Sequence, residues 1–124
     1  MPQYEGVTGG VLAYDIIPVL KTLKRAVVNV AATGDVVAAV AGKRIKVYAY
    51  AMQGQGTVNA FLRDGGAGDP LTLTWNFQAR EGVIAQPTKP PTYLFATSQG
   101  NALQVVLSAA VTVGVEVSFW DDDD

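Results

Sequence analysis

The sequence predicts an all-β protein: an antiparallel β-sandwich of the jelly-roll type, with about eight short strands and an extended N-terminal arm. Two observations lead to this prediction. Apolar and polar residues alternate with period two in segments separated by Gly, Pro, Asn and Asp. No segment between Arg25 and Trp120 combines sustained helical periodicity with a capping signal. The 124 residues suit one domain, and an immunoglobulin-like sandwich is the nearest alternative fold.

Residues 1–24 differ from the rest of the chain and are expected to form the arm. They mix Gly pairs, an interior Pro18 and apolar residues without sustaining either period. Because this apolar content is high for a solvated tail, the arm is expected to lie against its own domain or a neighbouring subunit. The side chains expected to make that contact are Val11, Leu12, Ile16, Ile17 and Leu20.

The sandwich domain is expected to span residues 25–120. Two strands are predicted most clearly, because alternation is strict in LTLTWNFQ (71–78) and in VTVGVEVSF (111–119). Weaker strands are predicted in AVVNVAA, DVVAAV, KRIKVYAYAM, TVNAFLRD, EGVIAQ, TYLFAT and ALQVVLS. Residues 121–124 are four adjacent Asp residues, whose mutual repulsion predicts a disordered acidic tail.

The composition argues against catalysis. The chain contains no Cys and no His, so it lacks thiol nucleophiles, thiolate ligands and the commonest general base. Most carboxylates fall at predicted turns, where Asp is favoured for local backbone bonding. No catalytic residue, cofactor or metal is therefore expected. The net charge of -2 becomes +2 without the four terminal Asp residues, which gives no reason to expect a polyelectrolyte partner.

The segment AGKRIKVYAYAMQGQGTVNAFLRDGG (41–66) is interpreted as turn, strand, glycine hairpin and strand. Strict alternation places Ile45, Val47, Ala49 and Ala51 inward and Arg44, Lys46, Tyr48, Tyr50 and Met52 outward. The outward set mixes basic and aromatic side chains, as single-strand nucleic-acid binders do, but Tyr, Arg and Met are also typical of protein interfaces. With a near-neutral body, a protein interface is favoured. The residues expected there are Arg44, Lys46, Tyr48, Tyr50 and Trp120.

The sequence also bears on phosphate binding and on sugar binding. The glycine clusters at 54–56 and 65–68 are each followed by a predicted strand, whereas a phosphate loop needs a following helix. Tyr48, Tyr50, Trp75, Tyr93 and Trp120 could stack on sugars, so a carbohydrate-binding module remains an alternative. No apolar run reaches the roughly 18 residues of a membrane span, and MPQYEGVTGG lacks the pattern of a secretory signal, so synthesis in a cytoplasm is expected.

The segments AAVAGKRIKVYAYAMQGQGTVNAFLRDG and FATSQGNALQVVLSAAVTVGVEVSF resemble a class of small bacteriophage virion proteins. The resemblance extends from Val27 to Phe119, and the PTKPPTYLF segment and the arm depart from the pattern. The matching parts are Ala39–Lys43, Arg44–Tyr50, Thr57–Arg63, Ala96–Leu103 and Leu107–Val117.

The resemblance implies a jelly roll or related β-sandwich that decorates a virion, with no catalytic residues. As a capsid cement protein it would sit on the capsid surface, made in the bacterial host cytoplasm, bind the major capsid protein and form a homotrimer. A tail- or fibre-associated subunit is the alternative location within the same class.

Overall fold

The computed structural model describes residues 23–66, 68–87 and 92–123. These residues form nine strands and no helix. In chain order the strands are β1 (Lys24–Val30), β2 (Gly34–Val37), β3 (Arg44–Gly54), β4 (Val58–Asp64), β5 (Trp75–Phe77), β6 (Gly82–Ala85), β7 (Phe95–Ala96), β8 (Leu103–Leu107) and β9 (Val113–Asp122).

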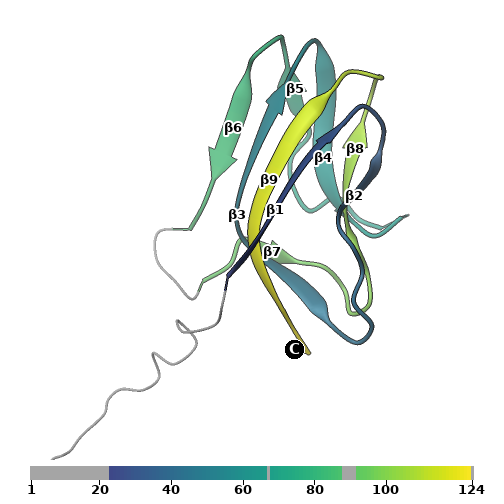
Figure 1. Ribbon diagram of the computed structural model, residues 1–124, viewed down its shortest axis with the longest axis vertical. Coiled ribbons are helices and arrows are strands. Elements are labelled where there is room, and N and C mark those ends of the chain that lie inside the picture. The colour runs from purple at the N-terminus through teal and green to yellow at the C-terminus, as the bar shows by residue number, and fades with distance from the viewer. Residues whose placement is uncertain (1–22, 67, 88–91, 124) are drawn as a thin grey trace, which may run out of the picture.

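The strands form two antiparallel sheets that face each other (Figure 1). Sheet A has the order β1-β9-β3-β6, and the short β7 also pairs with β3. Sheet B has the order β2-β8-β4-β5. The chain crosses between the sheets at every connection except β4 to β5 and β6 to β7, which is the wrapping of a jelly roll. The predicted all-β antiparallel sandwich is therefore confirmed, and each weaker strand segment contains a strand.

The core lies between the sheets and is built from the alternate residues that each strand turns inward. On β9, Val113, Val115 and Val117 are almost completely buried, as the strict alternation of that segment predicted. Leu62 on β4 and Leu103 on β8 face them from sheet B and are equally inaccessible to water. Removal of these apolar side chains from water is the main force that holds the two sheets together.

The prediction of one strand through LTLTWNFQ is wrong for its first half. Only Trp75–Phe77 is strand, and Leu73 is 73% exposed. Leu71 N donates to Leu62 O (2.8 Å), but Leu62 N donates to the Thr72 hydroxyl (3.1 Å) instead of to a backbone carbonyl. Because a side chain takes the place of the main chain, the ladder with β4 is interrupted here, and the alternation of side chains no longer reports strand geometry.

The segment Gly54-Gln55-Gly56 is not a hairpin, because β3 belongs to sheet A and β4 to sheet B. None of these glycines has positive φ. A Cβ at Gly54 would lie 2.8 Å from the Cβ of Phe77, so glycine is needed for close packing. The second glycine cluster does turn the chain between the paired strands β4 and β5, and Gly65 has φ of 73°.

The structure revises the predicted boundaries of the sandwich domain at both ends. Lys24, assigned to the arm, is the first residue of β1, and Asp121 and Asp122, assigned to a disordered tail, are the last two residues of β9. Residues 1–22 and 124 lie outside the described residues, and so do the predicted arm contacts Val11, Leu12, Ile16, Ile17 and Leu20.

Candidate protein-interaction surface

A β-bulge on β3 decides which of the predicted interface residues are exposed. Val47 pairs with Phe119 and Ala49 pairs with Ser118 of β9, so Tyr48 is an extra residue between two consecutive pairs. An inserted residue moves every following side chain to the opposite face of the strand. The predicted outward face assumed unbroken alternation along β3. Beyond Tyr48, residues that were expected to point outward therefore point inward, and the reverse.

Ile45 and Val47, before the bulge, point into the core as predicted. Beyond it Tyr50 and Met52 occupy the core, with exposures of 6% and 2%, so the prediction that they point outward is wrong. The predicted inward positions Ala49 and Ala51 are instead only half-buried and lie on the outer face of sheet A.

Tyr50 has a structural role between the sheets. Its hydroxyl accepts a hydrogen bond from Trp75 Nε1 of sheet B at 3.1 Å. Its ring lies against Phe95, with centroids 5.9 Å apart and an interplanar angle of 52°. A buried phenol needs a polar partner, and Trp75 supplies one across the core.

The remaining predicted interface residues do not share one exposed face. Arg44 is exposed and Tyr48 is half-buried, whereas Lys46 and Trp120 are 9% and 8% exposed. The expected surface of basic and aromatic residues therefore does not exist as a unit in the described chain.

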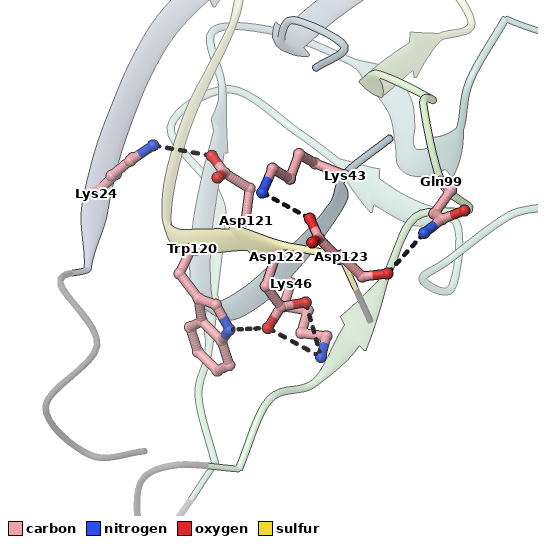
Figure 2. A network of polar contacts seen from close by, with 8 residues as sticks. All are labelled: Lys24, Lys43, Lys46, Gln99, Trp120, Asp121, Asp122 and Asp123. Atoms are coloured by element: carbon pink, nitrogen blue, oxygen red, sulfur yellow. Dashed lines mark hydrogen bonds and ion pairs between the residues drawn. The ribbon is translucent and has the colours of Figure 1, made fainter. Parts of the chain in front are cut away.

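The terminal Asp residues instead hold β9 against its neighbours (Figure 2). Three lysines are paired with three successive carboxylates: Lys24 Nζ with Asp121 Oδ2 (2.9 Å), Lys46 Nζ with Asp122 Oδ1 (3.1 Å) and Lys43 Nζ with Asp123 Oδ1 (2.6 Å). The lysine charges offset the repulsion on which the prediction of a disordered tail was based. The hydrogen bond that Lys43 Nζ donates to Asp123 also raises the pKa of Lys43 above its ordinary value.

Trp120 is part of this cluster. Its Nε1 donates to Asp122 Oδ2 at 3.2 Å, and its ring meets that of Tyr93 edge to face, with centroids 5.9 Å apart (Figure 2 shows the indole and Asp122). Lys46 Nζ lies 5.2 Å from the centroid of the Tyr93 ring. These contacts bury the indole of Trp120, which is 8% exposed, whereas Tyr93 keeps 42% of its surface exposed.

A second polar cluster fixes the loop before β8. Asp64 accepts hydrogen bonds from Ser98 N (2.9 Å), Ser98 Oγ (2.6 Å) and Asn101 Nδ2 (3.0 Å). Burial alone would raise the pKa of Asp64, but these hydrogen bonds outweigh it and hold the pKa below its ordinary value. The segment ATSQGNAL, which carries part of the resemblance, thus consists largely of residues that shape and anchor this loop.

Within the described residues, the outer face of sheet A carries exposed apolar residues from its two edge strands, β1 and β6. Backbone pairing aligns Val27, Glu116, Ala51 and Ile84 in one row across β1, β9, β3 and β6. Val27 and Ile84, on the two edge strands, are 55% and 80% exposed. Sequence reasoning missed this row, because its members come from four distant segments whose order in the sheet was unknown.

Between those edge strands the face is hollowed into a shallow groove of about 380 Å³. Its floor consists of small residues of the two central strands and β6: Ala51, Gly82 and Gly114. Glu116 lies beside the floor and accepts a hydrogen bond from Arg25 Nε at 2.6 Å, which lowers the pKa of Glu116 and raises that of Arg25. The groove is thus mainly apolar, with Gln53 and Glu116 also in its lining and Arg25 paired with Glu116.

The described residues contain no group of three or more Asp, Glu, His or Cys residues placed to hold a metal ion. Within the same residues, no helix has the length and apolar character needed to cross a membrane. Comparison with known proteins finds no matching family model, no matching curated protein and no matching solved structure.

Proposed function

We propose that this chain is a non-enzymatic structural subunit of a bacteriophage virion, a cement protein that decorates and stabilises the capsid by protein–protein contacts. The observation that carries the proposal is the place of the resembling segments. Arg44–Tyr50 and Leu107–Val117 contribute to β3 and β9, the central pair of sheet A, and Ala96–Leu103 forms the anchored loop before β8. They build the body of the sandwich, and this supports an architectural role.

The proposed partners are the major capsid protein and other copies of this chain, with a homotrimer as the expected assembly. A cement protein must bind several neighbours in the shell, and many weak contacts repeated over a lattice add through avidity. The arm residues Val11, Leu12, Ile16, Ile17 and Leu20 are proposed to contact the capsid protein or a neighbouring copy. The groove on sheet A offers a second apolar surface.

Copy number tests the proposal. Quantitative mass spectrometry of purified virions, calibrated with isotope-labelled peptides of this chain and of the major capsid protein, is expected to give hundreds of copies per particle. Few copies would instead favour a tail- or fibre-associated subunit, and absence from the particle would refute a virion role.

A binding experiment tests the contact itself. Shells purified without this chain are incubated with the full-length protein and sedimented, and the bound fraction is expected to saturate at a fixed ratio to the capsid protein. A truncated chain that begins at Leu23 tests the arm, with circular dichroism as the control for folding. Equal binding by both chains would show that the arm is not the docking segment.

A further inference from the structure

The outer face of sheet A has the properties of a surface that a binding partner covers. Among the exposed large apolar residues of the described chain, Val27 and Ile84 are the two that belong to strands, and they share one row of this face. An outward-facing strand position in contact with water is ordinarily polar. The two apolar side chains are therefore better explained by a partner than by solvent.

The shape of the face narrows the choice of partner. The central strands present Ala51 and Gly114 to the groove, whereas Ile84 projects from the edge strand β6 with 80% of its surface exposed. A projecting side chain and a groove of about 380 Å³, which Ile84 itself helps to line, thus lie on the same face of one molecule. Another copy of the chain offers an isoleucine that fits such a hollow and a hollow that fits such an isoleucine, either reciprocally in a pair or in turn around the proposed homotrimer.

The charges on the face are also self-complementary. Arg25 on β1 and Glu116 on β9 are 66% and 44% exposed and lie 2.6 Å apart (Nε to Oε2). One cation and one anion leave the face without net charge, which favours neither a nucleic acid nor a strongly acidic or basic protein. Another copy presents the same two charges, so opposite charges can face each other across such a contact.

The groove lacks the groups that a sugar would need. None of its lining residues presents an exposed aromatic ring, since Tyr50 beside it is turned into the core. Stacking on a ring is the usual way in which proteins hold the apolar face of a sugar. The carbohydrate alternative therefore finds no support on this surface.

We propose that copies of this chain associate through the outer face of sheet A, with Ile84 of one copy packed on the floor of the groove of another. This deepens the proposed function and rests on it for the expectation that copies meet. Strand spacing makes the face roughly 20 Å by 20 Å, or about 400 Å² per copy, against about 800 Å² in a standard stable interface. The contact is therefore reversible in solution and strengthens where the protein is concentrated on a shell.

Sedimentation equilibrium of the full-length protein over a wide range of concentration tests the proposal. The wild type is expected to associate reversibly, and Ile84→Asp is expected to weaken association about tenfold or more, because a carboxylate would have to enter an apolar hollow. Leu73→Asp is the matched control: Leu73 is 73% exposed, but it lies in the connection from β4 to β5 of the other sheet. This control is expected to associate like the wild type.

A second variant changes the groove that is proposed to receive Ile84. Ala51→Gln fills the floor of the groove and is expected to weaken association, with circular dichroism and thermal unfolding to confirm that the fold is intact. A monomeric wild type at all concentrations, or equal weakening by Ile84→Asp and Leu73→Asp, would overturn the proposal. Neither result depends on binding to virions. A failure of the self-association proposal is therefore distinguishable from a failure of the proposed virion role, which the copy number on particles tests.

Discussion

Lys46 of β3 and Asp122 of β9 form an ion pair, with Nζ and Oδ1 3.1 Å apart, at the end of the two central strands of sheet A. Their side chains are only 11% and 18% exposed. Each charge is therefore largely removed from water and is stabilised by the other, beside the contacts of Lys46 with the Tyr93 ring and of Asp122 with Trp120 Nε1. The pair joins β3 to β9 near the end of their ladder, so it ties the C-terminal end of β9 to the centre of sheet A.

Replacement of this lysine is expected to destabilise the fold. Lys46→Met leaves Asp122 without the ammonium group and is expected to lower the free energy of unfolding by about 2 to 3 kcal/mol, somewhat less than for a fully buried pair. Urea unfolding followed by tryptophan fluorescence measures it. Arg25→Met is the control, because it breaks a pair that water already screens, and no measurable loss is expected. Equal effects of the two variants would show that burial does not strengthen the Lys46 pair.

The order of the C-terminal residues gives a second prediction. Asp121 pairs with Ile45 and Asp122 with Arg44 in the β3–β9 ladder. Their backbone amides are therefore expected to show ¹H–¹⁵N heteronuclear NOE values close to that of Val117 in the middle of β9. The double variant Asp121→Asn, Asp123→Asn, which removes the charges that pair with Lys24 and Lys43, is expected to lower these values at residues 121–123. Values typical of a free tail in the wild type would instead support the prediction of disorder.

Strand positions were largely predictable from the sequence, because period-two alternation reports local geometry. Val113, Val115 and Val117 illustrate this, since every second residue of their segment is buried. The segment at Leu73 was mistaken for strand because a threonine hydroxyl replaced a backbone acceptor, and alternation carries no information about that exchange.

The candidate site was much harder to predict. It depends on which face of its strand each residue occupies and on the order of the strands in the sheet. The bulge at Tyr48 reverses the faces of Tyr50 and Ala51, and one extra residue leaves no mark in the composition of the strand. Likewise, the row from Val27 to Ile84 appears only once β1, β9, β3 and β6 are known to be neighbours. The acidic terminus was misjudged because its three lysine partners lie at least 76 positions earlier in the chain, the separation of Lys46 from Asp122.

Close packing at the start of the β3–β4 connection gives a third prediction. Gly54→Ala would bring a Cβ to 2.8 Å from the Cβ of Phe77, and the buried site has no room to relax without moving a core ring. The free energy of unfolding is expected to fall by about 1 to 3 kcal/mol, as for other overpacked cores. Gly66→Ala is the matched control, since its Cβ would meet no atom within 4 Å and its φ is not positive. The control is expected to be neutral or slightly stabilising in chemical denaturation.

The hydrogen bonds to Asp64 predict how stability changes at acid pH. Because they hold the pKa of Asp64 in the folded protein below its ordinary value of 3.8, the unfolded chain takes up this proton first as the pH falls. The stabilisation from Asp64 is therefore complete above its unfolded pKa and is lost as the pH falls through the lower folded value. Asp64→Asn is expected to reduce stability near neutral pH and to flatten its decline below about pH 4.

Glu116→Gln provides the comparison for this measurement, because Arg25 also lowers the pKa of Glu116 but does so at an exposed site. Thermal unfolding between about pH 2 and pH 7 measures both variants. The acid-sensitive part of the stability is expected to be reduced far more by Asp64→Asn than by Glu116→Gln, because Asp64 ties the loop at Ser98 and Asn101 to the end of β4. An unchanged pH profile for Asp64→Asn would mean that this loop holds its shape without the carboxylate.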